Sequence, residues 1–185
     1  MNPIPSSSSR RLCIAALCAA LVPVAAWGAD RGGLERDARA ALQKLTGNVP
    51  AAKSLSQSAT AVLVFPKITK AGLGVGGQYG DGVLFKGGKV AGYYNTSGAS
   101  YGLQAGAQQF GYVMFLMNDK AVDALGAKEG FEVGVGPSVV VVDEGKAKTM
   151  TTTTAKDDIY AFIFGQKGLM GGLGIQGNKI TRLKD

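Results

Sequence analysis

Glycine placement is the feature that most constrains the fold of this chain. Of the 185 residues, 28 are glycine, about twice the usual share of roughly 7%, without a collagen period or an excess of proline. From Ala61 onward, glycines separate short runs of β-branched, aromatic and aliphatic residues. Many short strands with frequent turn signals predict an antiparallel sandwich or barrel, in which glycines inside strands mark bulges and bends. Strands are expected at Ala61–Phe65 (stopped by Pro66), Gln78–Tyr79, Val83–Lys86, Val90–Tyr94, Gly111–Met117, Phe131–Val135, Ser138–Val142, Lys148–Thr153, Ile159–Phe164 and Leu173–Gln176.

Helices are expected beside these strands. Leu34–Leu45 places leucine and alanine at helical spacing on one face, which predicts an amphipathic helix, packed on the core or lying on a membrane surface. A second short helix is expected over Ala51–Ala59, and Asn118 is expected to cap a third at Asp119–Leu125, closed by Gly126. The predicted fold class is α+β: a mainly antiparallel sandwich or barrel of short glycine-rich strands, an N-terminal amphipathic helix and one or two short helices.

Residues 1–28 have the layout of a secretory signal peptide. Arg10 and Arg11 precede an uncharged apolar run from Leu12 to Ala26, and Ala26-Trp27-Gly28 offers small residues for cleavage. The run is short for a transmembrane span, and a retained N-terminal anchor is the alternative. We therefore expect cleavage after residue 28, a single domain over residues 29–185, and a periplasmic location or peripheral attachment to the cell envelope.

The missing residue types exclude several classes of enzyme. The chain has no histidine, which removes Ser-His-Asp hydrolysis, histidine-ligated metals and imidazole acid–base catalysis. Both cysteines, Cys13 and Cys18, lie in the predicted signal peptide, and each follows a leucine, which disfavours lipoprotein processing. No Walker sequence, paired-carboxylate signature or metal-ligand cluster is found. We expect a binding protein rather than an enzyme, with no cofactor and no metal.

Two glycine motifs resemble catalytic or nucleotide-binding signatures without their context. Gly72, Gly74 and Gly77 match GxGxxG, but a dinucleotide site needs a helix after the motif, and another turn and strand are expected here. Gly98-Ala-Ser100-Tyr-Gly102 matches the GxSxG nucleophile elbow, yet the chain has no histidine to serve as base. These glycines are expected to serve strand bends.

Positive charge is concentrated towards the N-terminus. The formal net charge is +7, and residues 29–89 carry nine basic and four acidic residues, whereas residues 90–185 carry nine of each. An anionic partner is the functional interpretation, and a basic secreted domain with cations spread over its surface is the alternative. Nucleic acid is not expected, because the lysines are not interleaved with aromatic residues in a nucleic-acid-binding pattern. A membrane with acidic headgroups suits an exported protein better.

Several motifs in a fixed order cover most of the chain. They are Val62-Leu-Val-Phe-Pro66-Lys67-Ile-Thr-Lys70-Ala-Gly72-Leu-Gly74-Val-Gly76-Gly77, then Gly102-Leu-Gln104-Ala-Gly106-Ala-Gln108, and the glycine-rich tail from Gly168 to Gly177. Over about residues 34–180 the chain closely resembles the SYLF domain family, also catalogued as the yeast actin-patch actin-binding domain family. Val139 to Lys156 departs from the family pattern and is expected to form a variable hairpin.

The resemblance implies binding of lipids, chiefly phosphoinositides or other anionic phospholipids, without catalysis. Some relatives bind actin filaments, which an exported protein is not expected to meet. In relatives a helix N-terminal to the domain assists membrane engagement, and here it corresponds to Leu34–Leu45. The family's Pro-Lys-x-x-Lys/Arg-x-Gly region maps onto Pro66, Lys67, Lys70 and Gly72. The candidate lipid-binding residues are Arg36, Arg39, Lys44, Lys53, Lys67 and Lys70.

Two other functional classes remain open from the sequence. One is a structural or protein-interaction module of the envelope, for which lipid would be incidental. The other is a small eight-stranded outer-membrane barrel, against which speak the short predicted strands and a C-terminus, Arg182-Leu-Lys-Asp185, without a terminal aromatic residue.

Overall fold

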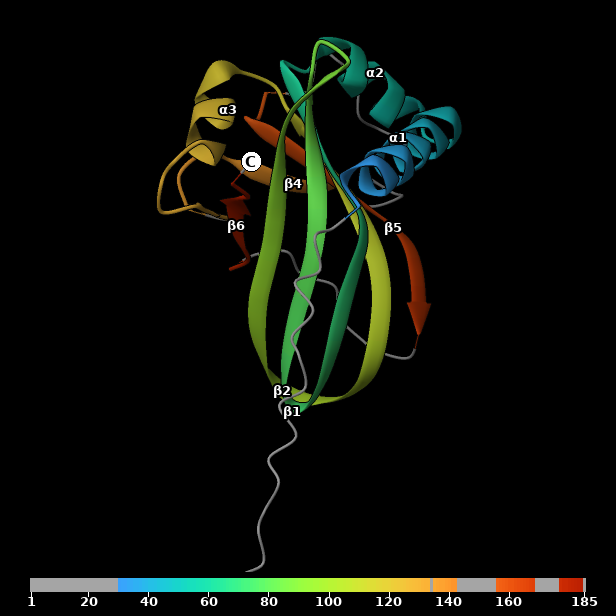
Figure 1. Cartoon of the computed structure of the whole chain (residues 1–185), viewed down its shortest axis with the longest axis vertical. Coiled ribbons are helices and arrows are strands. Elements are labelled where there is room, and N and C mark those ends of the chain that lie inside the picture. Colours follow the sequence, from blue (N-terminus) through green and yellow to red (C-terminus); the bar gives the residue numbers. More distant parts are fainter. Residues whose placement is uncertain (1–29, 134, 143–155, 169–176, 185) are drawn as a thin grey trace, which may run out of the picture.

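The computed structural model describes residues 30–133, 135–142, 156–168 and 177–184. The predicted α+β class is confirmed, because three helices accompany a curled, mostly antiparallel sheet that resembles half a barrel (Figure 1). The predicted signal peptide and the expected strands at Lys148–Thr153 and Leu173–Gln176 lie outside the described residues. No described helix is both long and apolar enough to cross a membrane. The elements are α1 (Arg31–Asn48), α2 (Pro50–Ser58), β1 (Ala61–Lys86), β2 (Lys89–Leu116), α3 (Asp119–Leu125), β3 (Phe131–Glu132), β4 (Val139–Val142), β5 (Ile159–Gly168) and β6 (Lys179–Arg182).

A single long hairpin of β1 and β2 dominates the sheet. The described strands follow the order β3-β6-β2-β5-β4, with β1 paired to β2, and only the β4–β5 ladder is parallel. The hairpin runs from the Lys86–Lys89 pair at its turn to the Ala61–Leu116 pair at its open end. Gly87 and Gly88 form the turn with φ angles of 58° and 75°, which a two-residue hairpin turn requires and which glycine adopts without strain.

The prediction of short strands is wrong for this hairpin, since β1 spans 26 residues and β2 spans 28. Pro66 does not end the strand. It lies at a register shift between Phe65 and Ile68, and a residue without an N–H is tolerated at such a bulge. Residues 72–77 likewise lie inside β1 rather than in a turn, next to a second register shift between Leu73 and Val75.

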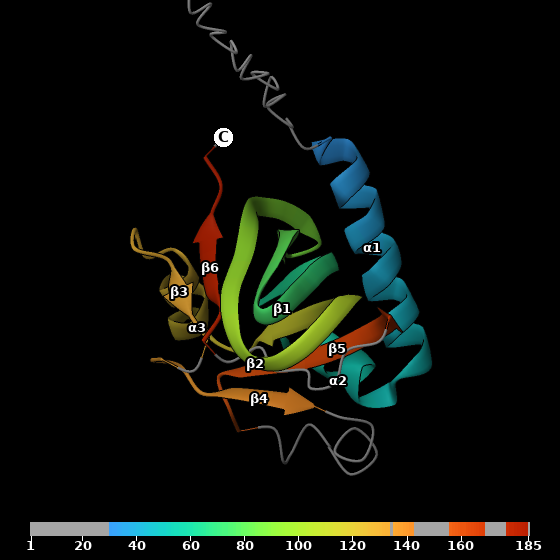
Figure 2. The same ribbon diagram turned by 90° about the horizontal axis from the view of Figure 1, so that it is seen from below.

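Glycines allow β1 to double over on itself. A methyl group on Gly72 would collide with the backbone of Gly76, and one on Gly80 would lie 2.7 Å from the carbonyl oxygen of Lys67. The same methyl group would lie 3.1 Å from the Cα of Ile68. The two halves of β1 therefore face each other at backbone distance, and the view from below shows the resulting curl (Figure 2).

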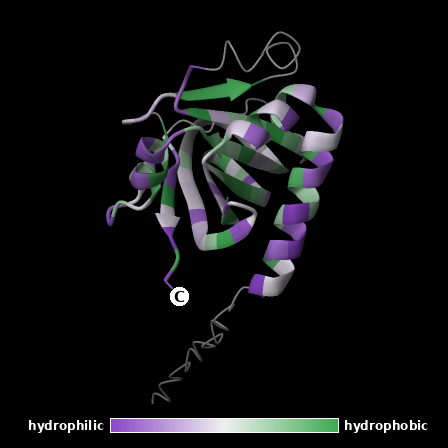
Figure 3. Ribbon diagram, turned by 90° about the horizontal axis from the view of Figure 1, so that it is seen from above, coloured by the Kyte–Doolittle hydropathy of each residue, from purple (hydrophilic) through white to green (hydrophobic). Residues whose placement is uncertain are grey.

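The curled sheet has a core on each face. The inner core includes Leu63, Phe65 and Tyr112, all fully buried. On the outer face, α1 and α2 cover the sheet, and the helices turn their hydrophobic sides towards it (Figure 3). The amphipathic helix predicted at Leu34–Leu45 is thus confirmed as a core-packed helix, which buries Ala38 and Leu45.

The shorter elements follow local signals. Pro50 stands at the first position of α2, where its missing N–H is not needed. The predicted cap of α3 is confirmed, because Asn118 Oδ1 accepts a hydrogen bond of 2.9 Å from the Ala121 N–H. The strand expected at Phe131–Val135 is limited to Phe131–Glu132, and the sequence did not predict β6.

Candidate functional site

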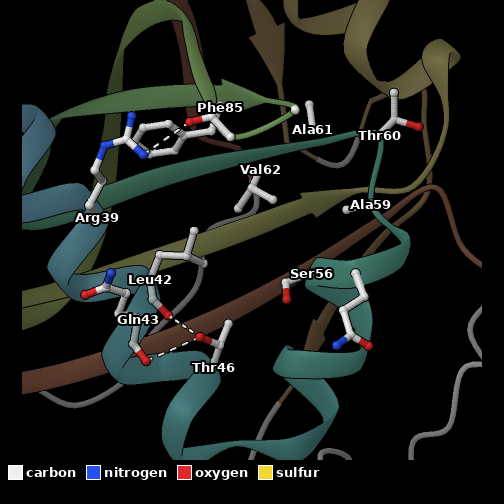
Figure 4. A pocket seen from close by; sticks show the side chains of 13 residues that line it. Arg39, Leu42, Gln43, Thr46, Ser56, Ala59, Thr60, Ala61, Val62 and Phe85 are labelled. Atoms are coloured by element: carbon white, nitrogen blue, oxygen red, sulfur yellow. Dashed lines mark hydrogen bonds between the residues drawn. The ribbon is translucent and has the colours of Figure 1, made fainter.

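A cavity of about 470 Å³ lies between α1, the end of α2 and the β1–β2 turn (Figure 4). Apolar side chains, hydroxyls and amides mix along its wall with a single cation, and no carboxylate lines it. The cavity can therefore hold a small amphipathic molecule, but it offers no acid–base pair for catalysis. The lining residues are Arg39, Leu42, Gln43, Thr46, Ser56, Gln57, Ala59, Thr60, Ala61, Val62, Phe85, Gly87 and Gly88.

Arg39, the one cation of this cavity, already has partners within the protein. Its guanidinium lies 4.7 Å from the centre of the Phe85 ring and donates to the Glu35 carboxylate, with an Nη2–Oε1 distance of 2.8 Å. It also donates to the carbonyl oxygen of Gly88 at 3.2 Å. These contacts fasten α1 to the hairpin turn, and the carboxylate offsets the charge that a lipid headgroup would meet.

Three other candidate cations are exposed and unpaired in the described part of the chain. Lys44 lies on α1, Lys53 on α2, and Lys67 on β1 three residues beyond Val64, which lies in the core beneath the helices. None of these lysines forms an ion pair with a described residue. Arg36 is also exposed but lies 3.8 Å from the Asp30 carboxylate. The exposed candidate cations are therefore Lys44, Lys53 and Lys67, with Arg36 partly neutralised by Asp30.

Lys70 is not one of these exposed cations, contrary to the sequence prediction. Its side chain is only 5% exposed. Side chains alternate between the faces of a strand, so Lys70 shares the inner face with Ile68, two residues earlier in β1. The motif that drew attention to Lys70 also lies within the strand rather than at a phosphate-binding turn.

Lys70 is part of an inner polar cluster that the sequence did not predict, formed with Gln78, Gln108 and Asn178, all at least nine-tenths buried. Gln108 is the cross-strand partner of Lys70. Gln78 faces Lys70, because the close approaches of residue 72 to 76 and of 68 to 80 bracket this pair. Gln78 Nε2, Gln108 Oε1 and Asn178 Nδ2 have no hydrogen-bond partner among the described residues. The alternate positions after Ile68 carry Lys70 and Gln78 with three glycines between them. This pattern indicates a polar cluster only once the doubling of β1 is known.

Other buried or perturbed polar groups have structural roles. Tyr112 donates a 2.9 Å hydrogen bond to Thr96, and burial raises the pKa of the Tyr112 hydroxyl. The Asp158 carboxylate accepts hydrogen bonds from Asn118 Nδ2 at 2.7 Å and from the Ser138 N–H at 2.9 Å, which lower its pKa to about 2. Asp158 thus joins the start of α3 to the β4–β5 edge. Within the described ranges, no three His, Cys, Asp or Glu side chains gather as a metal site would require.

A known family model matches the C-terminal part of this chain. Residues 97–185 match the family model described as "Ysc84: Las17-binding protein actin regulator". The SYLF resemblance is confirmed. This SYLF family consists of binding domains rather than catalytic ones. No curated protein matches the chain.

The SYLF match does not include the N-terminal elements of the chain. It covers most of β2 and everything that follows, but it does not reach α1, α2 or β1. All six candidate lipid-binding residues lie in these N-terminal elements. Their role therefore depends on the geometry described above.

Proposed function

We propose that this SYLF domain binds anionic phospholipid at a membrane surface in the cell envelope, without catalysing a reaction. The observation that carries the proposal is the exposure of Lys44, Lys53 and Lys67, unpaired among the described residues, in a segment that contains five bases and no acid between Ala38 and Gly80. The association of the family with lipid and actin binding supports it. Lipid is the better partner for a chain whose N-terminus predicts export.

The exposed lysines set the expected strength of the interaction. A cation near an anionic membrane surface contributes about 1 kcal/mol, so three lysines contribute about 3 kcal/mol. This free energy corresponds to roughly a hundredfold change in the partition constant. Such binding would be reversible and would weaken as salt is added, because counter-ions screen exposed charges.

Liposome co-sedimentation tests the proposal. The full chain is mixed with vesicles of neutral phosphatidylcholine, with or without phosphatidylglycerol, at low and high salt. We expect binding only to the anionic vesicles, and loss of most of it on substituting Lys44→Gln, Lys53→Gln and Lys67→Gln together. Equal binding to both kinds of vesicle at low salt would refute the electrostatic mechanism.

A matched triple variant tests whether binding depends on the position of the lysines or only on the net charge of the protein. Lys128, Lys156 and Lys184 are also exposed but lie outside the N-terminal elements. Their combined substitution by glutamine removes the same net charge, and we expect it to leave binding within about threefold of the unsubstituted protein. If both triple variants lose binding equally, only the overall charge matters and the proposed surface is wrong.

A further inference from the structure

The hydroxyl groups on the wall of the cavity between α1, α2 and the β1–β2 turn each donate their proton to a backbone carbonyl oxygen. The distance between donor and carbonyl oxygen is 3.0 Å for Thr46, 2.7 Å for Ser56 and 3.3 Å for Thr60. Figure 4 shows this bond for Thr46. A hydroxyl has one proton and two acceptor lone pairs. These three groups therefore offer acceptors, not donors, to a molecule in the cavity.

The charge of the cavity wall is nearly balanced. Arg39 is its one described cation, and the Glu35 carboxylate lies 2.8 Å from the guanidinium. A guanidinium carries five N–H donors, of which three are used by Glu35 and by the Gly88 carbonyl oxygen, so two remain. A phosphate or carboxylate group would find no uncompensated cation here. A neutral hydroxyl group, however, can accept from Arg39 and also donate to Thr46 or Ser56.

The buried side of the cavity is apolar. Val62 and Phe85 line it and are each less than a tenth exposed, and Leu42 of α1 lines it beside them. Such a surface suits the C–H groups of a carbon skeleton whose hydroxyls reach the polar wall. The volume of about 470 Å³ falls within the range of small-molecule sites, about 300–1,000 Å³. The wall and the buried side together fit a neutral polyol.

Lys53 places an exposed cation next to the cavity. Residues three and four apart are neighbours on the surface of a helix, so Lys53 adjoins Ser56 and Gln57, which both line the cavity. Lys53 forms no ion pair with a described residue. A lipid phosphodiester attracted to Lys53 would therefore bring its headgroup to the cavity.

We propose that this cavity is a polyol site, which binds a neutral group carrying neighbouring hydroxyls. The glycerol headgroup of phosphatidylglycerol supplies this chemistry in a membrane, and a free saccharide supplies it in solution. For the headgroup, the inference rests on the proposed lipid-binding function and adds a preference among anionic lipids of equal charge. Exposed lysines alone give no such preference, because their attraction to a membrane depends on its charge.

Vesicles that differ only in the headgroup hydroxyls test the polyol site. Phosphatidylpropanol has the same net charge as phosphatidylglycerol and lacks its two headgroup hydroxyls. We expect the full chain to partition at least about fivefold more strongly into phosphatidylglycerol vesicles, because two hydrogen bonds are gained. Thr46→Val combined with Ser56→Ala removes two acceptors from the wall. This double variant should lose the preference and keep its binding to phosphatidylpropanol vesicles.

Thr181→Val combined with Ser58→Ala is the matched control. Thr181 on β6 and Ser58 on α2 are exposed and do not line the cavity, so the same two kinds of hydroxyl are removed elsewhere. This control should retain the preference for phosphatidylglycerol, and urea unfolding checks that both double variants are folded. Loss of the preference in the control as well would overturn the assignment to this cavity.

A measurement without vesicles distinguishes the source of the polyol. Saturation-transfer NMR of the full chain with glucose detects a free saccharide. Glucose binding that the Thr46→Val and Ser56→Ala variant loses, without any preference between vesicles, would support the polyol site and overturn its lipid form. Equal binding to both kinds of vesicle without glucose binding would overturn the polyol site and leave the proposed function standing. Failure to sediment with any anionic vesicle would defeat the proposed function, and glucose binding would then decide the polyol site by itself.

Discussion

Replacing Gly80 by alanine should destabilise the protein through collision with the other half of β1. The added methyl group would lie 2.7 Å from the Lys67 carbonyl oxygen and 3.1 Å from the Ile68 Cα. Both atoms belong to the backbone, so relief requires the two halves of β1 to separate. Gly80 has no positive φ, and alanine can therefore adopt its conformation without backbone strain of its own.

The expected magnitude follows from two opposing effects. Overpacking a closely packed site costs about 1–3 kcal/mol. Alanine also reduces the freedom of the unfolded chain, which stabilises the folded state by about 0.4–1 kcal/mol. The net loss for Gly80→Ala is then about 1–2 kcal/mol. For a folded domain of this size, each kcal/mol shifts the unfolding midpoint by about 2–4 °C.

Gly77→Ala is the matched control, three residues away on the same strand. A methyl group there would find only the carbonyl oxygen of Gly98, at an ordinary contact distance of 3.8 Å. Thermal and urea unfolding of the full chain, followed by circular dichroism, should place Gly77→Ala at or slightly above the unsubstituted protein. The reasoning is refuted if the two variants unfold at the same midpoint, because the halves of β1 would then not be in backbone contact.

Other predictions concern the polar contacts. Tyr112→Phe removes a buried hydrogen bond to Thr96 and should lower the free energy of unfolding by about 1–2 kcal/mol, measured by urea denaturation. The pKa of Asp158 lies at about 2 in the folded protein, below its value in the unfolded chain, so its stabilising effect is complete above about pH 5 and is lost as pH falls towards 2. Asp158→Asn should therefore flatten the dependence of the unfolding midpoint on pH in this window, and an unchanged dependence would show that other carboxylates control it. Asn118→Ala removes the α3 cap and should cost about 1 kcal/mol, whereas Asn118→Ser should retain part of it.

The elements controlled by local sequence were the predictable part of this fold. The helical spacing of leucine and alanine in α1 predicts a helix whatever surface that helix packs against. The Asn118 side chain accepts a hydrogen bond from an N–H group three residues later, so this cap also depends only on local sequence. The glycines of β1 were harder to interpret, because a glycine can end a strand or let another backbone approach it. Only the contact between the two halves of β1 distinguishes these cases, and that contact joins residues separated along the chain.

The candidate site was predicted less well for the same reason. Lys67 and Lys70 belong to the same Pro-Lys-x-x-Lys-x-Gly motif, yet Lys67 is exposed and Lys70 is buried. The difference depends on the register shift at Pro66 and on strand alternation. The charge of Arg39 could be read from the sequence, but its stacking on Phe85 could not. The exposure of Leu73 and Val75 depends on where β1 bends.

The doubled hairpin has a consequence for the order of folding. Pairing between β1 and β2 can begin at the Gly87–Gly88 turn and extend outwards, each new pair enclosing those already formed, so that loop closure stays local. The outer core, however, unites Val64 from the first half of β1 with Val83 from the second half beneath α1 and α2. The helices can therefore complete their docking only after β1 has doubled over. We expect helix docking and closure of the distant bend to form one cooperative step, in which a change at either end of the molecule alters the protection of amides at the other.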